Sequence, residues 1–206
     1  MANHFFIDKR PHNGLTYKEY IELMENEIVN MDAESLTSVE LNEYEIKKLN
    51  LHRSRRIEKY YRVSSELKSE IQKIDSLQIW MVITENWCGD SAQNIPYFNK
   101  MAELNPNIYL KLILRDSNLD IMDQYLTNGT RSIPVLVAFD EDGNELFKWG
   151  PRPWELMDLI KVWKSDSCTK HELLEKIHLW YGRNRGKNIE AEFIKMIQES
   201  LITNHF

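Results

Sequence analysis

The sequence predicts an α/β fold with a central mixed sheet of about four strands, flanked by helices and extended by further helices at both ends. Three observations support this. Apolar segments rich in strand-forming residues alternate with helical patterns between residues 77 and 164. Asp142-Gly143 separates the last two apolar segments, as in a β-hairpin turn. Residues 15–75 contain two or three helical patterns and no convincing strand.

The composition limits the class of protein. With 206 residues the chain can bury a sizeable core, and its net charge of −6 argues against a nucleic-acid binder held by bulk charge. No apolar run approaches the roughly 20 residues that span a bilayer, and the first residues lack the apolar core of a signal peptide. Cys88 and Cys168 are the only cysteines, so no disulfide framework is implied. We therefore expect a reduced, cytoplasmic protein without membrane or nucleic-acid partners.

The N-terminal region, residues 1–75, is predicted to be a helical extension. Thr16 with Glu19, and Thr37 with Glu40, have the spacing of a capping box at the start of a helix. Ser64-Ser65 separates a last helix from the long one before it. No Pro- or Gly-rich linker follows, so we expect this region to pack on the core instead of forming a free domain.

A basic cluster lies in the long N-terminal helix. It consists of Arg53, Arg55, Arg56, Lys59 and Arg62, with Tyr60 and Tyr61 among them. It could bind RNA, or it could be a solvated helix face with arginines outward and tyrosines inward. Acidic residues dilute its charge, which favours the solvated face. These acids are Glu43, Glu45, Glu58 and Glu66.

The core elements are expected within residues 76–165, in the order β-α-β-α-β-β-α. The predicted strands cover 77–84, 108–114, 135–139 and 145–150. One helix is expected directly after Cys88, a second includes Ile121 to Leu126, and a third begins at Pro153. The first two strands should be parallel, and the hairpin should add antiparallel ones. Pro134 at the head of a strand marks a special junction, because X-Pro bonds are where cis peptides occur.

Trp87-Cys88-Gly89-Asp90-Ser91 lies at the turn from the first strand into a helix. Cys88 should meet the free N–H groups at the helix N-terminus, which favour a thiolate. Asp90 opposes this through its negative charge. The expected net effect is a modest lowering of the Cys88 pKa from its ordinary value of about 8.5.

These motifs resemble the thioredoxin family over residues 77–164. The resemblance rests on Trp87-Cys88-Gly89, Pro96, Gly129-x-Arg131-x-Ile133-Pro134, Asp142-Gly143 and Gly150. More narrowly, the chain is similar to bacterial thioredoxin-like proteins with a helical N-terminal region. The resemblance implies that Cys88 is the nucleophile and that Pro134 is the cis-proline facing it. It also implies a substrate-binding set of Trp87, Gly89, Asp90, Ile133, Trp149 and Gly150.

The departures from the family pattern define a monothiol site. Ser91 stands where the resolving cysteine belongs, and Val82 where a buried carboxylate assists proton transfer. Cys88 can therefore attack a disulfide, but an external thiol must release it, while the Ser91 hydroxyl can hydrogen-bond the thiolate. We expect Cys168 to lie at the wrong end of a helix to resolve Cys88.

The leading interpretation is a monothiol thiol–disulfide exchange protein acting on protein or low-molecular-weight disulfides, with an external thiol reductant. The alternative is a non-catalytic binding or regulatory module that keeps the groove. Iron–sulfur ligation is a third interpretation, because monothiol glutaredoxins also use Cys-Gly-x-Ser. Their glutathione-site pattern and their Gly-Gly are absent from the sequence, so no cofactor is expected. His171 and His178 lack nearby ligands, and no metal is expected.

The C-terminal residues 166–206 are predicted to form packing helices. One carries Leu173, Ile177 and Tyr181 and should end at Gly182, and another carries Phe193 and Ile197. Their aromatic surface could form the interface of a homodimer.

Overall fold

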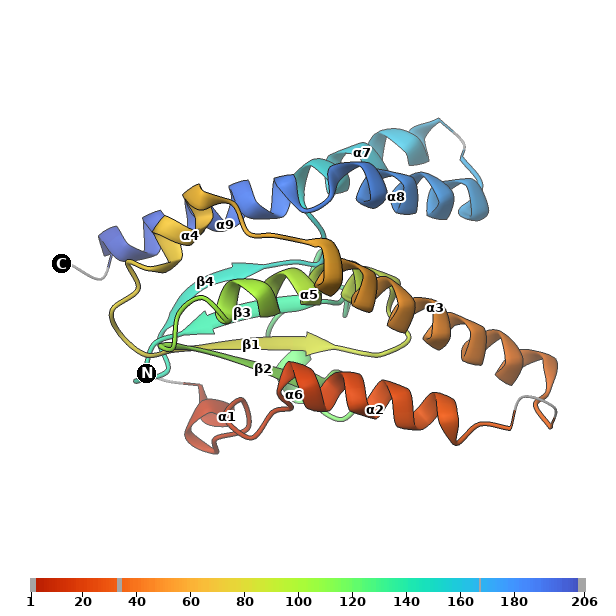
Figure 1. Cartoon of the computed structure of the whole chain (residues 1–206), viewed down its shortest axis with the longest axis horizontal. Coiled ribbons are helices and arrows are strands. Elements are labelled where there is room, and N and C mark those ends of the chain that lie inside the picture. Colours follow the sequence, from red (N-terminus) through yellow and green to blue (C-terminus); the bar gives the residue numbers. More distant parts are fainter. Residues whose placement is uncertain (1–2, 33–34, 167, 204–206) are drawn as a thin grey trace.

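The computed structural model describes residues 3–32, 35–166 and 168–203. Four strands form one mixed sheet in the order β2-β1-β3-β4 (Figure 1). They are β1 (Gln78–Thr84), β2 (Ile108–Leu114), β3 (Val135–Phe139) and β4 (Glu145–Trp149). β1 pairs in parallel with β2, whereas β3 is antiparallel to both β1 and β4. The α/β class and the strand order along the chain agree with the prediction from the sequence, and the strand bounds agree to within one residue.

The central position of β1 explains its unbroken apolar sequence. Every residue of β1 is buried, because β2 and β3 flank it and helices cover both faces of the sheet. Val82, for example, pairs with Leu112 on one side and with Leu136 on the other. A strand buried on both faces has no polar alternation, as the sequence showed.

Two hydrophobic clusters cover the two faces of the sheet. The larger one packs α5 (Gly89–Ala102), α2 (Tyr17–Val29), α4 (Ser65–Ile71) and α9 (Lys187–Thr203) around Trp80 and Phe98. The smaller one packs α1 (His4–Ile7) and α6 (Leu119–Met122) on the opposite face, around Met81 and Phe139. Cys88 belongs to the smaller cluster, at the end of the sheet where β1 stops.

The remaining helices extend beyond the sheet (Figure 1). α3 (Ser38–Tyr60) packs against α5, and its buried side chains are Asn50, Ser54 and Ile57. The first half of α3 is mostly exposed, including Leu41 and Leu49. α7 (Trp154–Ser165) and α8 (Lys170–Asn184) pair through a separate small cluster around Leu156 and Ile177.

Helix starts follow the sequence closely. Capping boxes at Thr16, Thr37 and Thr169 begin α2, α3 and α8, and the Ser64 side chain caps α4. Within the described ranges, no helix is long and apolar enough to cross a membrane.

Helix ends differ from the prediction in two places. α6 stops at Met122, so Tyr125 and Leu126 lie outside it. α8 passes Gly182 and ends only where Arg185 adopts a left-handed conformation with φ 52°. α1 was not predicted, since four residues are too few to show a helical period.

Candidate active site around Cys88

Cys88 lies at the junction of β1 and α5. It caps α5 with an extended backbone (φ −80°, ψ 115°), and its Sγ accepts a hydrogen bond from the Ser91 backbone N–H at 3.5 Å. The side chain is 8% exposed. The turn from a buried strand into a helix therefore places the thiol at the helix N-terminus, close to the surface but nearly covered.

A second loop supplies the opposite wall of the site. The Ile133–Pro134 peptide is cis, and the Cys88 thiol donates a hydrogen bond to the Ile133 carbonyl oxygen at 3.4 Å. Gly150 lies behind this loop with φ +133°, and a Cβ there would be 2.3 Å from the Pro134 carbonyl oxygen. Only glycine fits this close approach. The Gly150–Pro151 peptide is also cis.

A cavity of about 270 Å³ opens at Cys88. The residues that line it are Trp87, Cys88, Asp90, Arg115, Arg131, Ser132, Ile133, Pro151 and Arg152. Of the residues predicted for the site, the structure thus brings Trp87, Cys88, Asp90 and Ile133 together around one hollow. Pro134 and Ser91 are buried and are not among the residues that line it.

Three residues implied by the family resemblance do not line the cavity. The implied position of Trp149 on the groove rim is wrong, because its side chain is 1% exposed and packs against Phe98 in the core. Gly89 faces away from the cavity, since a Cβ there would meet Arg53 at 3.4 Å and His178 at 3.5 Å. Gly150 shapes the loop behind Pro134 and is not among the residues that line the cavity.

Arginines from separate loops surround the cavity, and sequence reasoning did not assign them to the site. The Arg115 guanidinium lies 4.8 Å from the centre of the Trp87 ring. Arg131 forms two hydrogen bonds with Asp123, at 2.6 and 2.9 Å. Arg152 pairs with Asp90. Arg115 follows β2, Arg131 precedes β3 and Arg152 follows β4. Because they lie in separate loops, no periodic pattern in the sequence connects them.

A hydrogen-bonded network holds Asp90 beside the thiol. Arg152 Nη2 lies 2.5 Å from one carboxylate oxygen, and the Tyr181 hydroxyl donates to the other at 2.9 Å. Asn94 Nδ2 in turn donates to the Tyr181 hydroxyl at 2.9 Å. α8, which supplies Tyr181, thus takes part in the site although sequence reasoning had treated it as a packing helix.

The pKa of Cys88 is raised above its ordinary value, which corrects the lowering expected from the sequence. Burial of the thiol is the largest cause, and the negative charge of Asp90 adds to it. Hydrogen bonds from Ser91 and from the Asp90 backbone act in the opposite direction and do not compensate. The loss of hydration therefore outweighs the helix N-terminus here.

No second thiol completes the site in the described structure. Both cysteines are free, and Cys168 follows the end of α7 at Ser165. Among the described residues, no group of three His, Cys, Asp or Glu side chains could hold a metal ion.

A cysteine that caps a helix and faces a cis-proline, on a mixed four-stranded sheet, defines a thioredoxin-like protein. A family model described as thioredoxin matches residues 37–164, and the chain belongs to this family. The match begins inside the N-terminal helical region, at the Thr37 cap of α3.

No curated protein matches the sequence. Two solved structures share the fold. A Pseudomonas aeruginosa protein of unknown function has a TM-score of 0.60 and 18% identity, over 96% of this chain and 98% of that one. A crystal structure of an HIV 4E10 epitope-scaffold has a TM-score of 0.59 and 19% identity, over 93% of this chain and 96% of that one. At this identity the likeness concerns the fold alone.

Proposed function

We propose that this protein carries out thiol–disulfide exchange with Cys88 as its nucleophile and without a resolving cysteine of its own. The observation that carries the proposal is the position of Cys88 Sγ, 3.4 Å from the carbonyl oxygen that precedes the cis-proline, at a cavity open to substrate. Membership of the thioredoxin family supports the reaction class.

The reaction takes place in two exchanges. Cys88 gives its proton to a solvent base, and the thiolate attacks one sulfur of a disulfide R–S–S–R′. A Cys88–S–S–R bond forms, the S–S bond of the substrate breaks, and R′S⁻ leaves. A thiolate R″S⁻ from outside then attacks the R sulfur, which forms R–S–S–R″ and returns the Cys88 thiolate. No net oxidation of the protein occurs.

The residue three positions after Cys88 decides the monothiol character. Ser91 is fully buried, and its hydroxyl cannot attack a mixed disulfide. Its contribution is to favour the thiolate through hydrogen bonding, which partly offsets the burial of Cys88. Release of the substrate therefore depends on the concentration of an external thiol.

Transfer from a defined mixed disulfide tests the proposal. A fluorescent peptide joined by a disulfide to glutathione serves as substrate, with free glutathione as the external thiol. We expect Cys88→Ser to abolish the protein-dependent rate and Cys168→Ser to retain it, since Cys168 follows α7 and lies outside the cavity. An unchanged rate in Cys88→Ser would exclude Cys88 as the nucleophile.

A second candidate function is a binding module that uses the groove without turnover. The observations that favour it are the small exposure of Cys88 and its raised pKa, because both slow thiolate chemistry. Peptide binding and mixed-disulfide formation, measured together, distinguish the exchange reaction from the binding module. Binding of a reduced peptide with equal affinity to the original protein and to Cys88→Ser, with no mixed disulfide in either, supports the binding module.

A further inference from the structure

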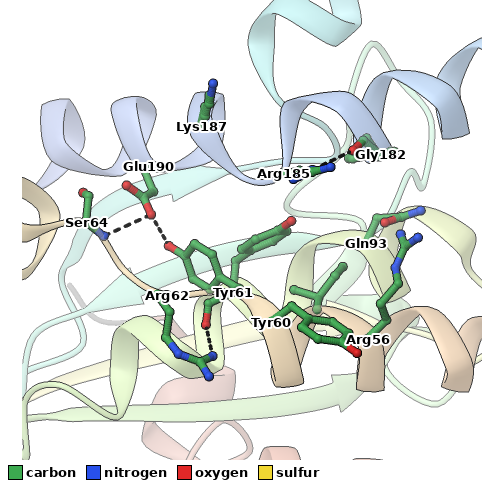
Figure 2. A pocket seen from close by; sticks show the side chains of 13 residues that line it. Arg56, Tyr60, Tyr61, Arg62, Ser64, Gln93, Gly182, Arg185, Lys187 and Glu190 are labelled. Atoms are coloured by element: carbon green, nitrogen blue, oxygen red, sulfur yellow. Dashed lines mark hydrogen bonds between the residues drawn. The ribbon is translucent and has the colours of Figure 1, made fainter.

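A second and larger cavity, of about 710 Å³, lies between the end of α3, α5 and the turn from α8 into α9 (Figure 2). It is lined by Arg56, Ile57, Tyr60, Tyr61, Arg62, Ser64, Gln93, Tyr97, Tyr181, Gly182, Arg185, Lys187 and Glu190. Its volume is within the range of sites that hold small organic ligands, about 300–1,000 Å³. The proposed exchange reaction does not use this cavity.

The charge around this cavity is strongly positive. Arg56, Arg62, Arg185 and Lys187 line it, and Glu190 is the only acid among the lining residues. Glu190 is already engaged: it accepts hydrogen bonds from the Tyr61 hydroxyl at 2.6 Å and from the Ser64 backbone N–H at 3.3 Å (Figure 2). A chain with a net charge of −6 thus concentrates cations around one hollow.

These cations are not used for ion pairs within the described part of the chain. Arg62 donates only to backbone carbonyls, those of Lys59 and Tyr61, and Arg185 donates to the Gly182 carbonyl. Arg56 and Lys187 have neither an ion pair nor a side-chain hydrogen bond among the described residues. By contrast, Arg55, the neighbour of Arg56 in α3, pairs with Glu25. The charge at the cavity is therefore free to bind an anion.

Aromatic rings provide the second part of a ligand site. Tyr60 lines the cavity and is 69% exposed. The solvated helix face considered from the sequence would have its tyrosines directed inward. Tyr61 and Tyr97 pack edge to face in the wall, with ring centroids 4.5 Å apart. Tyr61 and Tyr97 are buried, so the ring available for stacking is that of Tyr60, which has the Lys59 ammonium 5.3 Å from its centre. An exposed tyrosine ring stacks with planar ring systems.

The backbone of the turn from α8 to α9 also faces the cavity. Gly186 has φ +88°, and a Cβ there would lie 2.5 Å from the Tyr97 ring, so only glycine lets the turn approach this wall. α9 begins at the next residue, Lys187, and runs for 17 residues. Its N-terminus adds a positive partial charge beside the arginines.

We propose that this cavity binds a nucleoside diphosphate, with the phosphates at Arg56 and Arg185 and the base against Tyr60. The positive charge selects the phosphates, and the exposed ring selects a planar base. Because stacking tolerates different bases, the proposal does not specify which base is bound. It is independent of the exchange reaction at Cys88 and does not require Cys88 to turn over.

Isothermal titration calorimetry on the full chain tests the proposal, with ADP and UDP as probes and inorganic phosphate and adenosine as their parts. We expect ADP or UDP to bind with a Kd of roughly 10–100 µM, and each part to bind at least about tenfold more weakly. Arg56→Gln and Arg185→Gln should each weaken nucleotide binding about fivefold or more. Both side chains are exposed, so neither substitution should affect folding.

Two matched variants remove one positive charge elsewhere. Arg55→Gln changes the neighbouring arginine in α3, which pairs with Glu25, and Arg115→Gln changes an arginine at the Cys88 cavity. Both should bind nucleotide with the original affinity. The absence of binding by both ADP and UDP at millimolar concentration would overturn the proposal. So would a loss of affinity in Arg115→Gln that equals the loss in Arg56→Gln, or phosphate that binds as tightly as ADP.

Discussion

Arg152 Nη2 and Asp90 Oδ2 form an ion pair at 2.5 Å beside the Cys88 thiol. The two residues are 62 positions apart in the chain, and both side chains are mostly buried. Because Asp90 lies two residues after Cys88, its charge opposes a thiolate, and Arg152 offsets part of that charge. The pair therefore contributes to how easily Cys88 ionises, after burial of the thiol, which is the larger cause.

Asp90→Asn should lower the pKa of Cys88. The substitution removes the negative charge that raises this pKa and leaves the positive charge of Arg152 nearby. We expect the midpoint of the iodoacetamide alkylation rate against pH to fall by roughly 0.5–1 pH unit. Arg152→Gln should move the midpoint the other way, since it leaves Asp90 uncompensated.

The control for this pair is Asp158→Asn, an exposed carboxylate on α7 that pairs with Lys161. It makes the same change in charge and should leave the midpoint in place. Equal shifts in Asp158→Asn and Asp90→Asn would mean that overall charge, and not the position of Asp90, sets the pKa of Cys88.

The cationic rim of the Cys88 cavity should favour acidic substrates, if the exchange reaction takes place there. Arg115 and Arg131 flank the cavity, where each pairs with a half-exposed aspartate, Asp116 and Asp123. An acidic peptide next to its disulfide would take the place of these aspartates. We expect Arg115→Gln to slow exchange with an acidic peptide disulfide about threefold or more and to leave a neutral peptide unaffected. Stopped-flow fluorescence with both peptides measures this, and 0.5 M salt should remove the preference.

Arg55→Gln is the matched control, because Arg55 pairs with Glu25 and does not line this cavity. A preference for the acidic peptide that survives in Arg115→Gln and in Arg131→Gln would show that these arginines do not select the substrate.

The sheet could be predicted from the sequence because its strands are short, continuous apolar runs. The runs 108–114 and 135–139 coincide with β2 and β3 in full. Local patterns were sufficient for the strands and for placing Cys88 and Pro134 each at a junction between a predicted strand and a loop. That the two residues face each other was implied by the resemblance to the thioredoxin family.

The surroundings of the thiol depend on packing between distant segments, which local patterns do not report. Trp149 was assigned to the groove, but α9 covers it, and its indole N–H donates to Glu192. The direction of the Cys88 pKa was wrong for the same reason, since the burial that raises it depends on tertiary packing around the helix cap. The arginines of the rim come from loops without any period.

Ser91→Cys should convert the site into a dithiol site. The Ser91 backbone N–H lies 3.5 Å from Cys88 Sγ, so the new thiol would lie next to a mixed disulfide on Cys88. We expect the lifetime of a preformed Cys88–glutathione disulfide, in the absence of external thiol, to shorten at least about tenfold. Mass spectrometry of the adduct over time measures the lifetime.

Ser91→Ala is the control for this prediction, because it removes the Ser91 hydroxyl without adding a thiol. It should leave the lifetime of the adduct long. It should raise the Cys88 pKa slightly, because the Ser91 hydroxyl, which has no partner among the described residues, can no longer donate to the thiolate. If the glutathione adduct lasts equally long in Ser91→Cys and Ser91→Ala, a thiol at position 91 cannot reach the mixed disulfide on Cys88.

Glu192 should make the stability of the fold depend on pH near neutrality. Its carboxyl accepts hydrogen bonds from the Trp149 indole and from the Trp154 backbone N–H, both at 2.6 Å, and so joins α9 to β4 and α7. Burial raises the pKa of Glu192 from 4.5 to about 7. Between these values the folded protein holds a proton that the unfolded chain releases.

The free energy of unfolding should therefore fall as the pH rises from 4.5 to about 7, because the unfolded chain releases a proton that the folded protein still holds. The full rise in pKa corresponds to a contribution on the order of 3 kcal/mol, present below pH 4.5 and lost as the pH passes 7. Glu192→Gln cannot titrate, so urea unfolding should show a flatter pH dependence in this variant. Glu22→Gln, an exposed change on α2, should keep the original slope. Parallel pH profiles for the original protein and Glu192→Gln would show that Glu192 does not titrate in this range.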